Sequence, residues 1–136
     1  MTLIALVQNS PYTLIYFYPK DDTPGCTLEA QDFTRLKGEF AELDIQIIGI
    51  SKDSEVSHAK FCNKYNLGVI LISDEDGSLH EQYGVIGEKK NYGKVSIGVI
   101  RSTFFLDSTG KILKEWRNIK ATGHAEKVLR EVKNLI

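Results

Sequence analysis

Cysteine is scarce in this sequence. The 136 residues contain only two, Cys26 and Cys62. Two cysteines are too few for the disulfide framework of a small secreted domain. They also form no CxxC redox motif and cannot make a four-cysteine zinc site. We therefore expect a cytosolic protein whose thiols are either reactive or buried.

A charge excess and a long apolar run are also missing. Seventeen basic residues face eighteen acidic ones, which gives a formal net charge of -1. This balance, without a long basic cluster, argues against a nucleic-acid partner. No apolar run is long enough to cross a bilayer. The apolar start, residues 1–7, has no basic region and no clear cleavage site, so we predict no signal peptide.

What is present is an alternation of apolar runs and amphipathic stretches. Strands are expected at residues 13–18, 45–50, 69–72, 102–106 and 111–117, and helices at 27–43, 55–66, 78–83 and 123–136. Residues 1–12 are expected to be a lead-in, and the glycine-dotted residues 84–98 a loop. Alternating βαβ units imply parallel strands with right-handed crossovers, and a closing hairpin adds antiparallel ones. The predicted fold is a single α/β domain over residues 1–136, with a mixed central β-sheet flanked by helices and a thioredoxin-like outline.

Cys26 follows a turn-forming segment, residues 19–25, between the first expected strand and the first expected helix. At such a junction backbone N–H groups are unpaired and the helix dipole is positive. Both effects favour the thiolate, which is the nucleophilic form of cysteine. The alternative is a buried structural cysteine, but the flanking Pro, Gly, Thr and Asp residues are typical of exposed turns. We therefore favour a reactive thiol.

Two further polar residues have less specific positions. Thr23 lies three residues before Cys26, so its hydroxyl either approaches the sulfur or closes a local turn or helix cap. Arg101 precedes the expected strand at residues 102–106, and a basic residue at a strand edge is usually only solvated. His58 and Cys62 have a helical ligand spacing, but without further ligands nearby a metal site is not expected.

The segment Tyr16-Phe17-Tyr18-Pro19-Lys20-Asp21-Asp22-Thr23-Pro24-Gly25-Cys26-Thr27 resembles the active-site segment of peroxiredoxins. It is most similar to the peroxiredoxin Q, or bacterioferritin comigratory protein, branch. Pro19, Thr23 and Cys26 match the family motif Pro-x-x-x-Thr/Ser-x-x-Cys. Further similar blocks follow, namely Ser73-Asp74-Glu75-Asp76-Gly77, Tyr83-Gly84-Val85, Arg101-Ser102-Thr103-Phe104 and residues 123–129. The resemblance spans roughly residues 13–135, although family members usually carry a longer N-terminal segment than residues 1–12 provide.

The resemblance implies a role for each matching residue. Cys26 would be the peroxidatic cysteine, attacking a peroxide and becoming a sulfenic acid. Thr23 would orient the peroxide, Arg101 would stabilise the thiolate and the developing negative charge, and backbone groups near Gly25 would contribute. Pro19 would shape and shield the pocket. The resemblance further implies peroxide substrates, thioredoxin or a similar dithiol as reductant, a monomer, and no metal or organic cofactor.

The second cysteine leaves alternatives open. The commonest resolving position in this branch, five residues after Cys26, is occupied by Gln31. Cys62, in the next expected helix, resembles the resolving cysteine of other members. Alternatively, Cys62 is a buried structural thiol, and the protein is then a 1-Cys peroxidase. Because a disulfide requires closely spaced Cα atoms, resolution by Cys62 predicts local unwinding around one of the cysteines. A different class of function also remains, a thioredoxin-like binding or redox-sensing module that oxidises without turnover.

Overall fold

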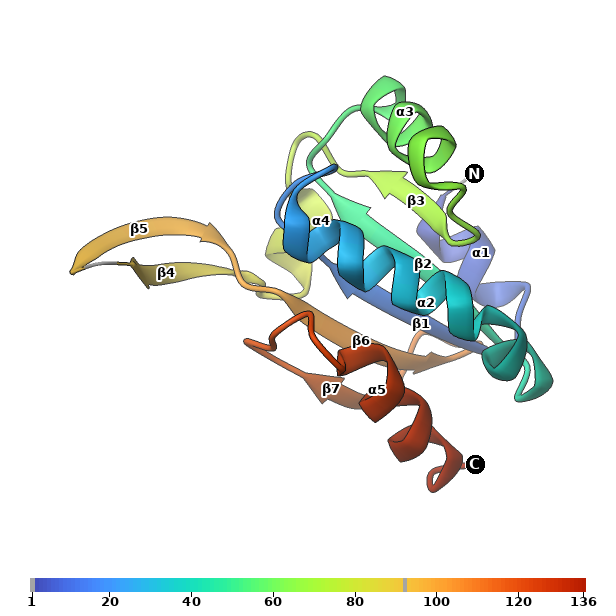
Figure 1. The fold of residues 1–136 in the computed structure, drawn as a ribbon. Helices are drawn as coiled ribbons and strands as arrows, with labels where there is room; N and C mark the ends of the chain where they lie inside the picture. The colour runs from blue at the N-terminus through green and yellow to red at the C-terminus, as the bar shows by residue number, and fades with distance from the viewer. Residues whose placement is uncertain (1, 92) are drawn as a thin grey trace.

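Five strands form the central sheet of the protein (Figure 1). The structure is a computed structural model that describes residues 2–91 and 93–136. In spatial order the sheet strands are β3 (Ile70–Ser73), β2 (Ile45–Ser51), β1 (Tyr12–Phe17), β6 (Ser102–Asp107) and β7 (Ile112–Trp116). β1 pairs in parallel with β2 and antiparallel with β6, so the predicted mixed sheet is confirmed.

Helices cover both faces of this sheet. They are α1 (Leu3–Gln8), α2 (Pro24–Glu42), α3 (Glu55–Tyr65), α4 (Ser78–Gln82) and α5 (His124–Lys133). Leu14 and Tyr16 of β1 pack with residues of α2 and α5, whereas Ile15 and Phe17 pack on the opposite face with residues of α1. Because side chains alternate along a strand, the run of residues 14–17 in β1 is buried on both faces. The thioredoxin-like α/β architecture expected from the sequence is therefore confirmed.

Helix α2 is the longest helix of the described chain, and its apolar spacing fixes it to the sheet. Ala30, Phe33 and Phe40 lie on one face and are almost fully buried, as expected for an amphipathic helix. The helix begins at Pro24, whose fixed φ and missing N–H suit the first helical position. Its start is earlier than the predicted residue 27, so Cys26 lies inside the first turn rather than before it.

Two sequence predictions were wrong. The lead-in contains α1, which Thr2 caps by accepting a hydrogen bond from the Ala5 N–H, and which buries Leu3 and Val7. The expected loop at residues 84–98 contains a β-hairpin made of β4 (Ile86–Asn91) and β5 (Lys94–Val99). Gly87 faces Gly98 across this hairpin, and these glycines led to the loop prediction because glycine normally weakens a strand.

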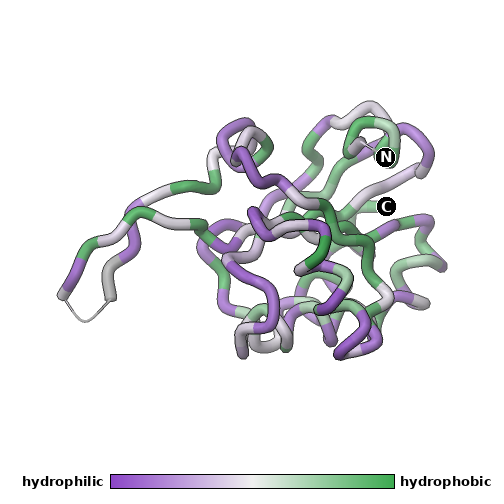
Figure 2. Tube along the Cα trace, turned by 90° about the horizontal axis from the view of Figure 1, so that it is seen from above, coloured by the Kyte–Doolittle hydropathy of each residue, from purple (hydrophilic) through white to green (hydrophobic). Residues whose placement is uncertain are grey.

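The hairpin projects from one end of the sheet, as Figures 1 and 2 both show. In Figure 2 the middle of the body is mostly green, and purple polar stretches lie around it. None of the helices in residues 2–91 and 93–136 combines the length and apolar character of a membrane span.

His124 joins α5 to the sheet and is the basis of a stability prediction. Its Nε2 lies 2.7 Å from the Thr103 hydroxyl, and its ring meets Phe33 and Trp116 edge-on. Burial, with the nearby charges of Lys127 and Arg101, lowers the pKa of His124 to about 4. The folded protein therefore binds a proton here less readily than the unfolded chain, whose histidine pKa is about 6.5.

We predict that His124 makes the fold less stable as the pH falls from about 6.5 to about 4, since the unfolded state then binds more protons. Relative to His124→Gln, which does not titrate, the natural chain should lose about 2 kcal/mol of unfolding free energy between about pH 7 and about pH 5. Urea denaturation at both pH values measures this difference. Equal pH dependence in the two proteins would contradict the prediction.

Candidate active site

The first turn of α2, directly after the loop from β1, holds the candidate nucleophile. Thr27 N–H donates the first helical hydrogen bond of α2, to Thr23 C=O at 2.8 Å. The N–H groups of Gly25 and Cys26 lie in the same first turn, where no preceding helical carbonyl can accept from them. Cys26, only 1% exposed, therefore sits at the positive end of the helix dipole.

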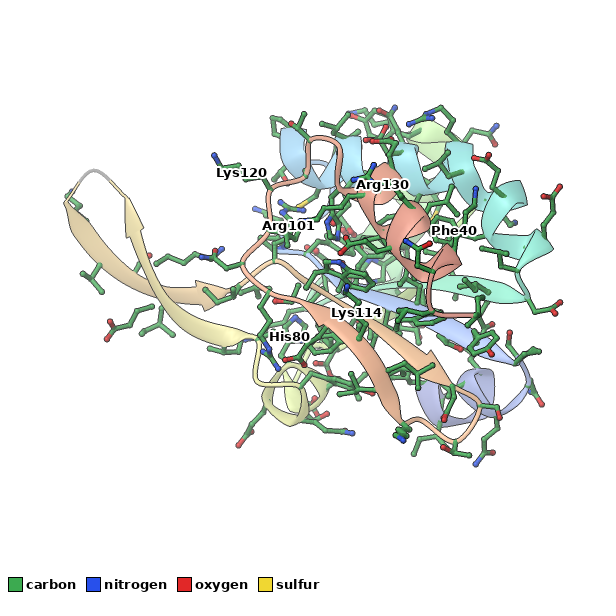
Figure 3. The ribbon with its side chains drawn as sticks, turned by 90° about the horizontal axis from the view of Figure 1, so that it is seen from below. Phe40, His80, Arg101, Lys114, Lys120 and Arg130 are labelled. Atoms are coloured by element: carbon green, nitrogen blue, oxygen red, sulfur yellow. The ribbon has the colours of Figure 1, made fainter. Side chains whose placement is uncertain are left out.

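Arg101 approaches this thiol from the connection between β5 and β6. Its Nη2 lies 3.4 Å from Cys26 Sγ, and Figure 3 shows Arg101 at the end of the molecule from which the hairpin projects. A Cβ on Gly25 would lie 3.2 Å from the same Nη2, so a side chain there would crowd the guanidinium. The sequence alone favoured a solvated Arg101, but the structure places it in contact with Cys26, as the resemblance implied.

Glu29 holds Arg101 in this position and was missed by the sequence analysis. Its Oε1 accepts a hydrogen bond from Arg101 Nη1 at 2.7 Å. Glu29 is 1% exposed, and burial raises its pKa to about 7 although the positive charge of Arg101 opposes this shift. The available signal was its spacing: three residues after Cys26, Glu29 lies on the same face of α2.

The hairpin carries a partly buried lysine, Lys89. Lys89 on β4 lies across the hairpin against Gly98, and a Cβ on that glycine would be 3.6 Å from the lysine side chain. Burial, followed by the charge of Arg101, lowers the pKa of Lys89, whereas Cys26 acts in the opposite direction.

Thr23 and Pro19 shape the loop before the helix. The Thr23 hydroxyl does not cap α2 but donates a hydrogen bond to Lys20 C=O at 2.8 Å. Its oxygen lone pairs remain able to accept a hydrogen bond from a ligand. Pro19 is partly buried just after β1, where its missing N–H cannot extend the strand ladder. The hydrogen bond from the Thr23 hydroxyl to Lys20 C=O closes a local turn, which is one of the two arrangements that the sequence allowed.

Cys62 lies elsewhere, on α3. It lines a hollow together with Glu55, His58, Ala59 and Leu71, and Cys26 is not among the lining residues. Burial, and then the charge of Asp21, raises the pKa of the Cys62 thiol, which disfavours its nucleophilic thiolate form. Both cysteines are free.

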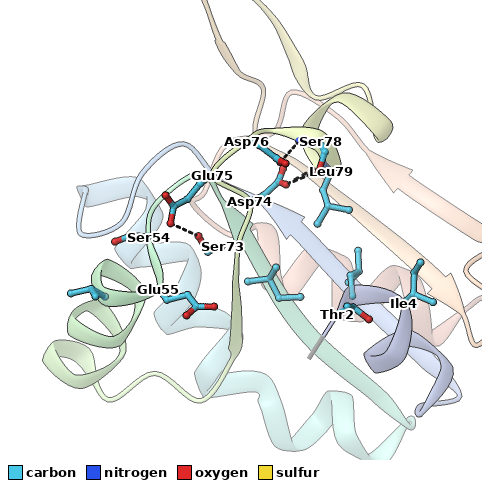
Figure 4. Close-up of a pocket in the computed structure, with 13 residues that line it drawn as sticks. Thr2, Ile4, Ser54, Glu55, Ser73, Asp74, Glu75, Asp76, Ser78 and Leu79 are labelled. Atoms are coloured by element: carbon cyan, nitrogen blue, oxygen red, sulfur yellow. Dashed lines mark hydrogen bonds between the residues drawn. The ribbon is translucent and has the colours of Figure 1, made fainter.

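Other clusters of polar side chains have structural roles. Figure 4 shows a hollow of about 810 Å³ between α1, α3, β3 and α4 that no residue around Cys26 lines. Its Asp74 accepts hydrogen bonds from the Leu79 and His80 N–H groups, and Asp76 accepts one from the Ser78 N–H. These carboxylates therefore hold the start of α4. Within residues 2–91 and 93–136 no group of three or more His, Cys, Asp or Glu side chains could hold a metal ion.

A buried cysteine at a helix N-terminus, contacted by an arginine on a thioredoxin-like sheet, defines a thiol-based redox protein. The family model for the AhpC/TSA family matches residues 2–115. Peroxiredoxin Bcp of Bacillus subtilis is 47% identical over 124 residues, covering 91% of this chain and 79% of that protein. A putative peroxiredoxin bcp of Helicobacter pylori is 46% identical over 88% of this chain and 78% of the relative.

Solved structures agree with the sequence relatives. A cysteine-to-serine variant of Xanthomonas campestris peroxiredoxin Q superposes with a TM-score of 0.91 at 43% identity, covering 100% of this chain and 85% of the other. The bacterioferritin comigratory protein of the same organism gives a TM-score of 0.89 at 42% identity, over 98% and 84%. The chain belongs to the AhpC/TSA family, in its Bcp and peroxiredoxin Q branch.

We predict that Arg101→Lys slows the reaction of Cys26 with hydrogen peroxide about a hundredfold. Lysine keeps the charge but cannot donate to Glu29 and Cys26 at once from a planar fork. Stopped-flow kinetics in a Cys62→Ser background measure this step alone. Arg117→Lys is the matched control, because Arg117 is an exposed arginine that donates only to Tyr83 and Gly84 C=O and to Glu115. An Arg101→Lys rate within twofold of the natural rate would refute the assignment.

Proposed function

We propose that the protein is a thiol-dependent peroxidase that uses Cys26 to reduce hydrogen peroxide and organic hydroperoxides. The observation that carries the proposal is the contact of 3.4 Å between Arg101 Nη2 and Cys26 Sγ at the N-terminus of α2. Relatives across most of the chain are peroxiredoxins. The Xanthomonas campestris protein noted above is described for its alkyl peroxide reduction activity, which supports organic hydroperoxides as substrates.

In the first step the Cys26 thiolate attacks the terminal oxygen of the hydroperoxide. An S–O bond forms and the O–O bond breaks, so that sulfur loses two electrons and becomes a sulfenic acid. The leaving oxygen takes a proton and departs as water or an alcohol. Arg101 stabilises the thiolate before the attack and the growing negative charge during it, because its donors are already held in place by Glu29.

The loop residues orient the peroxide. The Thr23 hydroxyl, fixed by its hydrogen bond to Lys20 C=O, accepts a hydrogen bond from the peroxide O–H and so aligns the O–O bond with the sulfur. The N–H groups near Gly25 and Cys26 add positive potential around the bound oxygens. Pro19 shields this pocket from water.

In the second step Cys62 resolves the sulfenic acid. Its sulfur attacks Cys26 Sγ, an S–S bond forms, and the hydroxyl leaves as water. Two solved variants of Xanthomonas campestris peroxiredoxin Q have serine at two different cysteine positions, separated by the same number of residues as Cys26 and Cys62. This correspondence supports Cys62 over a 1-Cys mechanism.

A dithiol protein, for which thioredoxin is our candidate, then reduces the disulfide to two thiols and becomes oxidised itself. The cycle needs no metal or organic cofactor, because sulfur carries both electrons. We further propose that the protein acts as a monomer in the cytoplasm, where such reductants maintain thiols.

The test is peroxide consumption with thioredoxin, thioredoxin reductase and NADPH. We predict sustained turnover by the natural chain and a loss of at least about a thousandfold in Cys26→Ser, since serine is a far weaker nucleophile and has no redox chemistry. Cys62→Ser should consume about one equivalent of peroxide and then stop.

Normal turnover by Cys62→Ser would assign the 1-Cys mechanism with a structural Cys62. One equivalent of peroxide consumed by the natural chain, without turnover on any thiol reductant, would replace the enzyme by a redox sensor. Mass spectrometry of the oxidised proteins separates sulfenic acid from disulfide in each case.

A further inference from the structure

Two consecutive aspartates of the active-site loop contact α3 on either side of Cys62. Asp21 Oδ2 accepts from Ser57 Oγ at 2.8 Å and lies 2.7 Å from His58 Nδ1, one turn before Cys62. Asp22 accepts from Lys64 Nζ at 2.8 Å and from the Tyr65 hydroxyl at 2.5 Å, just after Cys62. The loop that precedes Cys26 is therefore attached to the helix that carries the second cysteine.

The contact made by Asp21 is buried and complete. Side-chain exposure is 4% for Asp21 and 6% for His58. The other carboxylate oxygen, Oδ1, accepts from the Tyr18 hydroxyl at 2.6 Å, and the Asp21 N–H donates to Asp53 at 2.8 Å. A buried carboxylate with this set of partners is costly to detach, because Ser57, His58 and Tyr18 would each lose a hydrogen bond.

The charges on this pair reinforce the attachment. Burial opposes ionisation of Asp21, but the hydrogen bonds from His58, Tyr18 and Ser57 outweigh it and lower the pKa of the carboxyl. Burial likewise opposes the charged imidazole, but Asp21 raises the pKa of His58. Each partner thus favours the ionised form of the other.

The contact made by Asp22 is of a weaker kind. Side-chain exposure is 42% for Asp22 and 57% for Lys64, and exposed ion pairs add little to stability. The two neighbouring aspartates therefore allow a direct comparison of a buried and an exposed attachment to the same helix.

Formation of a disulfide requires Cα atoms about 4.4–6.8 Å apart. In this structure Cys26 contacts Arg101, whereas Cys62 faces a separate hollow beside His58. Helix α3 or the turn around Cys26 must therefore open for Cys62 to reach the sulfenic acid, and the bonds from Asp21 to Ser57 and His58 hold these two segments together.

We propose that Asp21, through Ser57 and His58, is a positioning residue that keeps α3 folded during peroxide reduction and sets the rate at which Cys62 is released for resolution. We call these three side chains the Asp21 latch. The proposal rests on the proposed peroxidase function for its kinetic consequence, but opening of α3 can be measured without any peroxide.

The first experiment measures exposure of Cys62 in a Cys26→Ser background by its rate of alkylation with iodoacetamide. Each rate is extrapolated to full ionisation of the thiol from its pH dependence, because the Asp21 charge also raises the Cys62 pKa. Asp21→Asn keeps the size of the side chain but removes the charge that faces His58. Loss of a charge-assisted buried hydrogen bond should raise the open population of α3, and with it the alkylation rate, about tenfold. An unchanged rate would overturn the latch.

Two control variants separate the latch from general destabilisation. Asp22→Asn should change the alkylation rate less than about twofold, because its ion pair is exposed. Asp74→Asn breaks another buried Asp–His contact, in which Asp74 Oδ2 lies 2.6 Å from Nδ1 of His80 on α4. If Asp74→Asn exposed Cys62 as much as Asp21→Asn at an equal loss of stability, the latch would be refuted.

The second experiment follows both chemical steps with Cys26 intact. Asp21→Asn should form the disulfide about tenfold faster after one equivalent of peroxide, while sulfenic acid formation changes less than about threefold. A general loss of structure would slow both steps together and would refute the latch. Faster alkylation without any disulfide would support the latch and remove Cys62 from the resolving role, so the two proposals fail separately.

Discussion

The site depends on the guanidinium of Arg101, held between the Cys26 thiol and the buried Glu29 carboxyl. Glu29 supplies a fixed acceptor on one side, so the opposite edge of the guanidinium is directed at the sulfur. The positive charge then lies where both the thiolate and the leaving oxygen need it, without rearrangement during the reaction. The close approach of Arg101 also explains why residue 25 is glycine, since a Cβ would come within 3.2 Å of Nη2.

The remainder of the fold serves to bring distant segments to this point. β1 and β6 are antiparallel neighbours, with Phe17 paired to Ser102, so the loop after β1 and Arg101 before β6 meet at one end of the sheet. Helix α2 then sets Cys26 and Glu29 one turn apart on a single face. The loop before Cys26 also contacts α3 through Asp21. One buried carboxylate therefore links the segment next to Cys26 to the helix that carries Cys62.

Much of the fold followed from local patterns. The strands β1, β2 and β6 each contain a run of apolar residues, and α2, α3 and α5 have helical spacing, so each was predicted to within a few residues. Helix α1 was missed because its apolar run is short and its burial of Leu3 and Val7 depends on the sheet. The β4–β5 hairpin was missed because Gly87, Gly98 and several charged residues are typical of a loop. Only cross-strand pairing between segments makes it a strand pair.

By itself, the sequence determined the order of the elements, the position of Cys26 at a strand–helix junction and the resemblance to peroxiredoxins, because these are properties of adjacent residues. Only the tertiary structure decided which distant groups reach the sulfur. Arg101 and Glu29 are 72 residues apart in the chain, yet Arg101 Nη1 lies 2.7 Å from Glu29 Oε1. This proximity depends on strand pairing that no local pattern encodes. Packing likewise decided which side chains surround Cys62 and which carboxylate binds its helix. Helical spacing places Cys62 on α3 but does not show which loop α3 contacts.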